Sequence, residues 1–307
     1  MSLYNKYRPQ ELKEIIGNKE IISYLESVIQ KDVEEPPNVY LFHGPTGCGK
    51  TTLARILSKE FGCSISDLSL LEINTANFRG IDTVRELITT SKYKGFGSDG
   101  RRMWIIDEVH KMTNDAQNAL LKLLEDPPKD SYFILCTTDP NKLLPTVRGR
   151  CIELGVKPLN DNQMERLLKR ISKAEGQKVK RIVREQIIQD SFGLPRNAIQ
   201  ILEKVLGTPA DKQLEIAEQS AKEYSESIEL CRGLLEPSTW KMIREILKGL
   251  KDQEPESIRR HVLGYAQGVL LKSDNTKAAF ILEEFTEPFY NSGFAGLILA
   301  CYTIIKG

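Results

Sequence analysis

Apolar and polar residues follow two different patterns in the two halves of the chain. In the first half, short apolar runs that fit buried strands alternate with segments of helical spacing. The expected strands are Val39–Phe42, Leu70–Asn74, Met103–Asp107, Tyr132–Thr138 and Cys151–Leu154. The expected helices are Glu20–Gln30, one that starts near Lys50, Ile81–Lys92 and Asn114–Glu125. This alternation predicts an α/β fold with a doubly wound, parallel, five-stranded sheet.

The strand pattern ends after Lys157-Pro158. Helical periodicity then predicts three helices, a linker at 207–209 and a further all-helical region from Asp211 onward. We therefore expect an α/β domain over 1–156, a small helical domain over 157–207 and a further helical domain over 208–307. The three predicted helices of the small domain are Asn162–Ala174, Val179–Asp190 and Pro195–Val205.

One loop carries the clearest chemical signal. Gly44-Pro45-Thr46-Gly47-Cys48-Gly49-Lys50-Thr51-Thr52 fits the phosphate-loop pattern G-x-x-x-x-G-K-[ST] in full, between an expected strand and an expected helix. Its glycines allow positive φ angles, so that successive backbone N–H groups point at one spot, and the helix N-terminus favours phosphate. Lys50 is expected to reach the β- and γ-phosphates, and the Thr51 hydroxyl to bind Mg²⁺. The loop thus predicts ATP and Mg²⁺ as cofactors.

A pair of acids ends the third expected strand. Ile105-Ile106-Asp107-Glu108 places two carboxylates at the edge where a parallel sheet binds ligands. Asp107 is the expected partner of Mg²⁺, directly or through water, and Glu108 the group that polarises the attacking water. Taken alone, the pair is equally compatible with a strand end capped by two acids. The complete phosphate loop upstream favours the catalytic interpretation.

Composition adds few constraints. The net charge of +1, from 43 basic and 42 acidic residues, argues against a uniformly basic nucleic-acid coat but allows a local basic patch. The six cysteines form no C-x-x-C pair, so we expect reduced structural thiols and no zinc ribbon. The first residues lack a signal-peptide pattern, and no apolar run is long enough to span a membrane. We expect a cytoplasmic protein with no membrane partner, in the host cytoplasm if the chain comes from a phage.

Together these motifs resemble one family. The chain looks like an ATPase subunit of an AAA+ sliding-clamp loader, similar to replication factor C small subunits, bacterial gamma/tau subunits and phage loader ATPases. The phosphate loop and the acidic pair match, as do five further motifs. These are Lys-Tyr-Arg-Pro at 6–9, Arg-Gly-Ile-Asp-Thr-Val-Arg at 79–85, Ala-Gln-Asn-Ala-Leu at 116–120 and Gly-Leu-Pro-Arg at 193–196, together with Arg-Cys at 150–151.

The resemblance implies roles for residues outside the loop. By this resemblance the domain over 157–207 would be the lid and that over 208–307 the collar. Thr138 would be the sensor-1 residue and Arg196 the sensor-2 arginine of the lid domain. Arg150 would be an arginine finger that acts on the ATP of a neighbouring subunit. Any single arginine is more often a surface charge, so these roles rest on the resemblance. The implied nucleotide-binding residues near the N-terminus are Tyr4, Tyr7, Arg8, Pro9 and Ile16.

Two features depart from the family pattern. The family's Ser-Arg-Cys is Gly149-Arg150-Cys151 here, which loosens the local backbone but keeps the arginine. The four-cysteine zinc module of many bacterial gamma subunits is absent. This absence favours a phage or replication factor C-like loader over a bacterial chromosomal one.

The resemblance also implies partners: a sliding clamp, primer–template DNA and other loader subunits in a pentameric ring. Non-specific contact with DNA phosphates is expected from Arg79, Thr83, Arg85 and Lys111, although these are equally explained as solvated charges. The loop Tyr93–Gly97 would face the clamp, unless it is a plain surface loop. The last third would form the collar, unless its helices only pack on themselves.

We therefore expect an ATP hydrolase that loads a processivity clamp onto primer–template DNA during replication. One alternative is another AAA+ DNA motor, such as a branch-migration or recombination ATPase. The second alternative is a structural loader subunit that does not hydrolyse ATP, although the complete phosphate loop and the presence of Glu108 argue against it.

Overall fold

The computed structural model describes residues 2–30, 36–66, 68–75, 80–91, 93, 100–224, 226–271 and 273–306. The chain divides into two compact units. The first holds residues 3–163 together with Leu194–Arg196, and the second holds residues 164–193 and 197–307. The predicted lid and collar regions lie mostly in this second unit, so the expected boundary at 207 stays a prediction.

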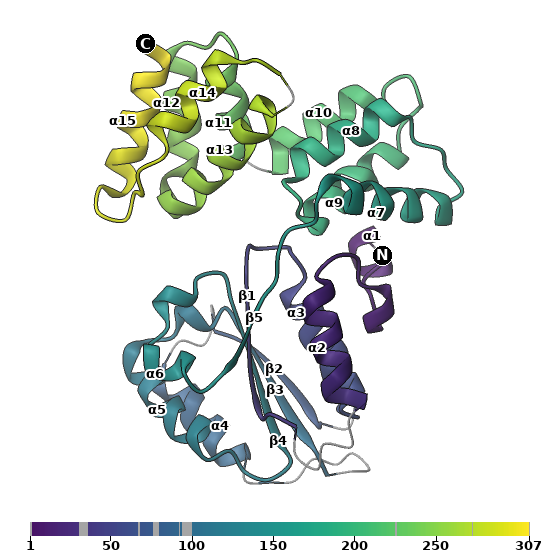
Figure 1. The fold of residues 1–307 in the computed structure, drawn as a ribbon, viewed down its shortest axis with the longest axis vertical. Helices are drawn as coiled ribbons and strands as arrows, with labels where there is room; N and C mark the ends of the chain where they lie inside the picture. The colour runs from purple at the N-terminus through teal and green to yellow at the C-terminus, as the bar shows by residue number, and fades with distance from the viewer. Residues whose placement is uncertain are drawn as a thin grey trace. The chain divides into compact units, whose positions relative to one another are not determined.

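The first unit is built on a parallel sheet of order β2-β3-β4-β1-β5 (Figure 1). Such sheets are covered on both faces, so their central strands read as continuous apolar runs, as β1 and β4 do here. The strands are β1 (Val39–His43), β2 (Leu70–Asn74), β3 (Arg102–Asp107), β4 (Ser131–Thr137) and β5 (Ile152–Gly155). The predicted doubly wound α/β architecture is confirmed.

Helices cover both faces of this sheet. The helices α2 (Lys19–Gln30) and α3 (Lys50–Glu60) lie on one side, as Figure 1 shows. The other side carries α4 (Ile81–Ser91), α5 (Asn114–Glu125) and the short α6 (Pro145–Arg148). On that side, alternate strand residues such as Trp104 and Phe133 pack against α4, α5 and α6 in one apolar core. Their rings stack at 4.9 Å on adjacent strands.

Short elements complete the first unit. They are α1 (Leu3–Lys6), which the sequence did not predict, and the 3₁₀ turns η1 (Leu12–Glu14), η2 (Val109–Lys111) and η3 (Pro140–Lys142). The fourth strand ends at Thr137, one residue before the prediction, because the Asp139 backbone N–H turns back to the Thr137 hydroxyl. The fifth strand begins at Ile152, since Cys151 still closes the preceding turn through Arg148.

The second unit is helical, as predicted. Its helices after α7 (Asp161–Ala174) are α8 (Arg181–Ser191), α9 (Pro195–Leu206), α10 (Gln213–Tyr224), α11 (Glu226–Leu235), α12 (Trp240–Gly249), α13 (Pro255–Leu270), α14 (Thr276–Glu284) and α15 (Gly293–Lys306), with the 3₁₀ turn η4 (Leu250–Asp252). Helices α11 to α15 share one apolar core. None of the helices in the described part of the chain is both long and apolar enough to cross a membrane.

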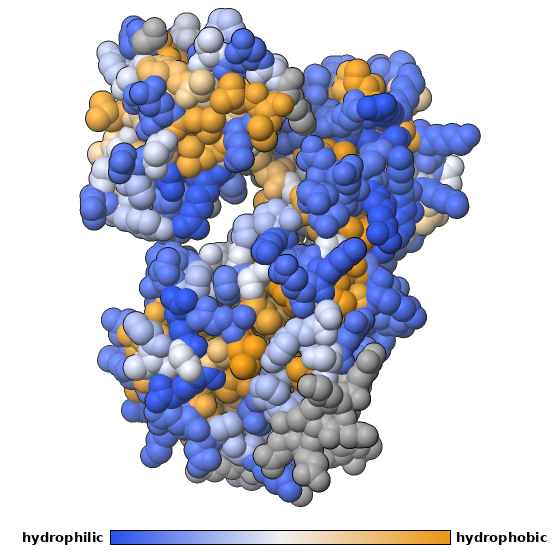
Figure 2. Space-filling view, viewed as in Figure 1, coloured by the Kyte–Doolittle hydropathy of each residue, from blue (hydrophilic) through white to orange (hydrophobic). Residues whose placement is uncertain are grey.

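Some apolar side chains of this unit face outward. Leu299 and Tyr302 of α15 and Met242 of α12 are exposed, and Tyr302 contacts the Trp240 ring edge-on at 5.0 Å. Figure 2 shows apolar surface gathered over this group of helices.

All six cysteines of the chain are free, and burial raises the pKa of Cys48 in the phosphate loop, so its thiol stays protonated at neutral pH.

Candidate functional site: a phosphate loop and its acidic partners

The phosphate loop joins β1 to the N-terminus of α3 and has the backbone that the motif predicts. Gly44 and Gly47 have φ angles of +146° and +77°, which other residues rarely adopt. A Cβ atom at Gly44 would lie 2.2 Å from the Val156 carbonyl oxygen, so no larger residue fits there. The Gly44 N–H donates to the Thr137 carbonyl at 3.2 Å, which ties the start of the loop to β4.

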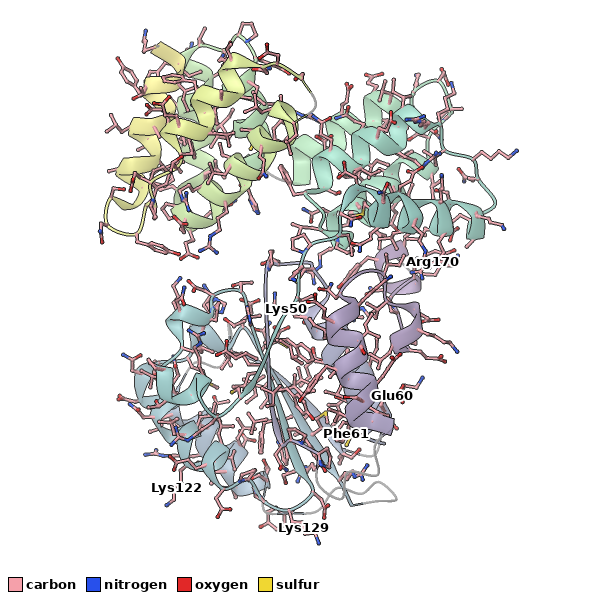
Figure 3. The ribbon with its side chains drawn as sticks, in the orientation of Figure 1. Lys50, Glu60, Phe61, Lys122, Lys129 and Arg170 are labelled. Carbon is pink, nitrogen blue, oxygen red and sulfur yellow. The ribbon has the colours of Figure 1, made fainter. Side chains whose placement is uncertain are left out.

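Lys50 begins α3 and folds back over the loop. Its side chain is buried, and Nζ donates to the carbonyl oxygens of Gly44 at 2.9 Å and Pro45 at 3.0 Å. These bonds stabilise a buried ammonium group that would otherwise be costly. Figure 3 shows Lys50 next to the end of β1. The positive charge thus lies within the loop, where a phosphate would be held.

The Thr51 hydroxyl donates to Asp107 Oδ2 at 2.8 Å, across 56 positions of the sequence. The structure therefore brings together the two residues that the sequence predicted as the magnesium site. A hydroxyl and a carboxylate are oxygen ligands of the type that Mg²⁺ prefers. Asp107 Oδ1 accepts the Glu108 N–H at 2.9 Å, which fixes the carboxylate plane.

Glu108 follows β3 in an unusual backbone conformation, with φ +56° and ψ +34°. Such left-handed backbone in a residue with a side chain is uncommon and concentrates at functional sites. Burial, with a smaller contribution from Asp107, raises the pKa of Glu108 above its ordinary value. The side chain is still 29% exposed, so solvent reaches it.

Thr75, just after β2, holds this backbone in place. Its hydroxyl lies 3.0 Å from the Asp107 carbonyl oxygen and 2.6 Å from that of Glu108, and its N–H donates to Asp107. A second side chain, His110, contacts the Glu108 carboxylate itself. The sequence analysis missed both residues. A polar residue directly after β2 and a histidine two positions after Glu108 were the available signals.

The N-terminal segment supplies an aromatic residue to the loop region. Arg196 Nη2 donates to the Tyr4 hydroxyl at 3.3 Å, and the Arg196 and Arg8 guanidinium groups lie 5.1 and 4.8 Å from the Tyr4 ring centre. Burial would raise the pKa of Tyr4, but the hydrogen bond and charge of Arg196, aided by Arg8, lower it overall. The Arg196 N–H contacts the Gly47 carbonyl at 3.4 Å. Tyr4, Arg8 and Arg196 thus meet beside the phosphate loop.

The remaining predicted nucleotide-binding residues occupy the same unit. Tyr7, Pro9 and Ile16 are half-buried in the N-terminal segment, and Pro45 and Thr46 are exposed at the loop tip. Thr52 is buried in the first turn of α3. Thr138 is half-buried directly after β4.

Arg150 does not join this cluster. Its guanidinium donates to the Glu125 carboxylate at the end of α5 and to the Thr146 carbonyl oxygen at 2.7 Å. The neighbouring Gly149 has an ordinary helical conformation, with φ −63°, so a serine would fit the same backbone. The difference from the family motif therefore leaves the position of Arg150 unaffected.

The predicted DNA-contacting residues fall in two places. Thr83 and Arg85 lie in the first turns of α4, where Arg85 pairs with Asp82 at 2.9 Å. Lys111 is exposed in η2. Arg79 lies outside the described residues. Of the loop expected to face the clamp, the structure describes Tyr93, which is exposed.

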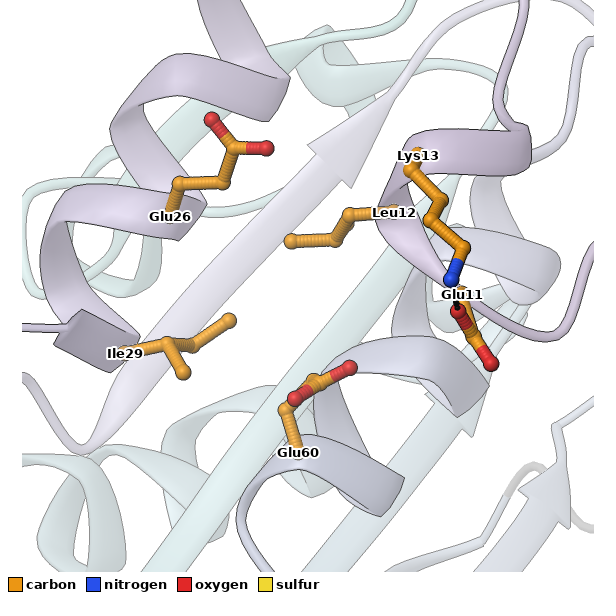
Figure 4. A pocket seen from close by; sticks show the side chains of 6 residues that line it. All are labelled: Glu11, Leu12, Lys13, Glu26, Ile29 and Glu60. Carbon is orange, nitrogen blue, oxygen red and sulfur yellow. Dashed lines mark ion pairs between the residues drawn. The ribbon is translucent and has the colours of Figure 1, made fainter.

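A separate hollow of about 190 Å³ lies between the N-terminal segment, α2 and the end of α3 (Figure 4). Its charged lining includes Glu26, Glu60 and the pair Lys13–Glu11, whose charged groups are 2.6 Å apart. None of the phosphate-loop residues lines it. This hollow is therefore distinct from the candidate nucleotide site.

Comparisons with known proteins agree with these motifs. Residues 64–160 match the model of the family described as DNA polymerase III, delta subunit. The chain is 34% identical over 232 residues to DNA polymerase III subunit gamma/tau of Mycobacterium tuberculosis, covering 69% of this chain and 40% of that protein. It is also 34% identical over 199 residues to the replication factor C small subunit of Methanococcus vannielii, covering 64% of this chain and 62% of that protein.

Over about two thirds of its length the chain is thus similar to subunits of DNA polymerase III and of replication factor C. It spans about two fifths of the gamma/tau relatives and about three fifths of the replication factor C relative. Among solved structures, the Holliday junction branch migration motor RuvB of Thermotoga maritima matches with a TM-score of 0.61 at 20% identity. The match covers 80% of this chain and 85% of that one, and at this identity it shows a shared fold alone.

Proposed function

We propose that this chain is an ATP-hydrolysing subunit of a sliding-clamp loader. The observation that carries the proposal is the hydrogen bond between Thr51 and Asp107, beside a buried Lys50, in a homologue of clamp-loader ATPases. It completes a site of the right chemistry for a nucleoside triphosphate and Mg²⁺. The comparisons with gamma/tau and replication factor C favour this function over a branch-migration motor, since the likeness to RuvB extends to fold only.

Each site residue then has a role. The backbone N–H groups of the loop and Lys50 would hold the β- and γ-phosphates. Thr51 and Asp107 would hold Mg²⁺, which would supply positive charge to neutralise that of the phosphates. Lys50 would exchange its two carbonyl partners for phosphate oxygens on binding. Tyr4, with Tyr7, Pro9 and Ile16 nearby in sequence, borders the adenine. Arg196 reaches the phosphates from the start of α9.

Hydrolysis requires a polarised water. Glu108 is exposed enough to meet a water, and burial together with Asp107 raises the pKa of its carboxyl group toward the range that suits a general base. Thr138 lies directly after β4, where its hydroxyl would bind the γ-phosphate or that water. The presence of Glu108 argues against a structural subunit that does not hydrolyse ATP.

Arg150 acts in trans in this proposal. In the described chain it pairs with Glu125 rather than with the phosphate loop, as expected of a group that serves a neighbouring subunit. We propose a lid over 157–207 and a collar over 208–307, with the exposed apolar residues of α12 and α15 contributing to subunit contacts in a pentameric ring. The partners are other loader subunits, the clamp and primer–template DNA.

DNA contact in this proposal is non-specific. Thr83 and Arg85 at the start of α4 and Lys111 before α5 lie at or near helix N-termini, which bind phosphate oxygens without reading bases. Arg79 belongs to the same predicted set.

The experiment compares ATP binding and hydrolysis by the wild-type chain with those of Lys50→Ala and Glu108→Gln, each assembled with the loader subunits encoded in the same genome. We expect Lys50→Ala to lose binding, and Glu108→Gln to keep binding but lose hydrolysis by about 10²–10⁴-fold. Lys129→Ala, an exposed lysine at the turn before β4 (Figure 3), serves as the control. Wild-type turnover equal to that of Glu108→Gln would refute the proposed hydrolase.

A further inference from the structure

His110 is a buried histidine next to the proposed catalytic glutamate. It lies in η2, and its side chain is 4% exposed. Nε2 lies 3.4 Å from Glu108 Oε2, and Nδ1 lies 3.0 Å from the hydroxyl of Thr137, the last residue of β4. One ring thus connects the end of β3 with the end of β4, the two strands whose ends carry Glu108 and Thr138.

The donors and acceptors in this contact are compatible with one neutral form of the ring. A carboxylate only accepts hydrogen bonds, so the contact with Glu108 is favourable when Nε2 carries a hydrogen. In a neutral ring Nδ1 is then an acceptor, which can take the hydrogen of the Thr137 hydroxyl. Thr137 Oγ1 in turn accepts the Asp139 N–H at 3.0 Å. A series of polar contacts therefore runs from Asp139 through Thr137 and His110 to Glu108.

The backbone and the side chain of Glu108 are held by different residues. Thr75 contacts the backbone carbonyl of Glu108, whereas His110 contacts the carboxylate. A general base must be held within hydrogen-bond reach of its water, and small displacements are costly in rate. Of the contacts described here, the one between His110 and the Glu108 carboxylate is the one that can orient this carboxylate.

We propose that His110 is a positioning residue for ATP hydrolysis, which holds the Glu108 carboxylate toward the attacking water and links it to the end of β4. The inference rests on the proposed hydrolase function. His110 itself touches neither nucleotide nor water in this proposal. Since Thr137 precedes Thr138, a shift of the sensor residue on nucleotide binding is passed through the ring to the general base.

The test is a set of variants that separates the two ring nitrogens. His110→Gln places an amide nitrogen near the position of Nε2 and keeps the contact with Glu108. His110→Asn places its amide near Nδ1 and keeps the contact with Thr137 only. Steady-state ATP hydrolysis and ATP affinity are measured for both, for His110→Ala and for wild type, together with thermal melting.

We expect His110→Ala and His110→Asn to lower kcat by about 10–100-fold. Loss of a side chain that orients a functional residue typically reduces activity by this amount. ATP affinity should stay within about 2-fold, and His110→Gln should recover most of kcat. If the ring only fills the core, His110→Gln and His110→Asn will have equal turnover. Alternatively, kcat will fall across the variants in proportion to the decrease in melting temperature. Either result overturns the inference, and the Gln–Asn pair decides even where His110→Ala fails to fold.

A double variant separates this inference from the function on which it rests. If His110 acts through Glu108, Glu108→Gln/His110→Ala will be no slower than Glu108→Gln alone. An additional loss of 10-fold or more would show that His110 acts elsewhere and would overturn the inference. If Glu108→Gln itself leaves turnover unchanged, the proposed function fails instead.

Discussion

At the scale of single residues, the site is held by polar side chains that each have a partner on a different element. Thr51 of α3 is fixed by Asp107 of β3, and Tyr4 of α1 by Arg196 of α9. Each link joins positions far apart in the sequence, so the fold must form before the site does. The consequence is that a change at one partner should affect a specific property rather than the whole site.

Thr51→Ala removes the hydroxyl that Asp107 holds. We expect the Mg²⁺ concentration for half-maximal hydrolysis to rise by about 10–100-fold, because an oxygen ligand of the metal is lost. Thr51→Ser keeps the hydroxyl and is the matched control. Measurement of turnover across a Mg²⁺ titration checks this, and an unchanged half-maximal concentration would remove Thr51 from the metal site.

At the scale of elements, the sequence predicted most of the first unit because its signals are local. β2 and α5 have the predicted bounds, since an apolar run or a 3.6-residue period fixes each without distant contacts. The glycine pattern likewise predicted the positive φ angles of the phosphate loop. In contrast, the contacts of Thr75 with Glu108 and of His110 with Thr137 span 33 and 27 positions, and no local pattern encodes them.

The exact end of β4 could not be predicted from the local sequence pattern either. A run of β-forming residues continues through Thr138, so the pattern places the strand end there. The strand ends at Thr137 because Asp139 caps the next turn, donating its N–H to Thr137 and accepting the Asn141 N–H with its side chain. The pairing of Arg150 with Glu125 was likewise not predictable, since it joins positions 25 apart.

The turn η2 carries the exposed Lys111 just before α5. Lys111→Ala should shallow the salt dependence of binding to primer–template DNA by about one unit of log K against log salt, because one phosphate contact is lost. Lys129→Ala removes an exposed lysine elsewhere in the same unit and should leave the slope unchanged. Equal slopes for wild type and Lys111→Ala would exclude Lys111 from DNA contact.

Glu256 connects the start of α13 with the segment before α15. Its carboxylate accepts two bonds from Arg259, both at 2.7–2.8 Å, and the Phe289 N–H at 3.1 Å, and its side chain is 6% exposed. Burial would raise the pKa of Glu256, but the hydrogen bonds of Arg259 and Phe289 outweigh it and lower the pKa below its ordinary value. The ionised form therefore stabilises the fold.

Glu256→Gln should lower the free energy of unfolding by about 2 kcal/mol at neutral pH, because charge-assisted hydrogen bonds are lost. The group has a folded pKa below its unfolded one, so its stabilisation is complete above the unfolded pKa and disappears as the pH falls through the folded pKa. Thermal or denaturant unfolding at several pH values checks this. A gap between wild type and variant that persists unchanged into strong acid would contradict the account.

At the scale of the whole molecule, the chain has two compact units, each with its own core. The proposed loader function requires more than one copy or partner. In that proposal Arg150, which pairs with Glu125 in its own chain, serves the ATP of a neighbouring subunit. Such fingers are worth about 10³–10⁵ in rate. An isolated subunit should therefore hydrolyse ATP slowly.

Arg150→Ala tests this arrangement by complementation. Arg150→Ala keeps the general base and lacks the finger, whereas Glu108→Gln keeps the finger and lacks the base. In assembled loaders each variant alone should be nearly inactive, and a mixture should regain hydrolysis at the interfaces that combine both intact groups. A mixture that stays inactive, although native mass spectrometry shows mixed assemblies, would place the action of Arg150 within its own chain.

The most direct test of the central claim is the rate of ATP hydrolysis by the chain assembled with the loader subunits encoded in the same genome. The rate is measured alone, with the sliding clamp, with primer–template DNA, and with both. The account predicts a low basal rate that clamp and DNA together raise by at least about 10-fold, within the range of trans-acting groups. A high rate that is indifferent to clamp and DNA would contradict the assignment as a clamp loader.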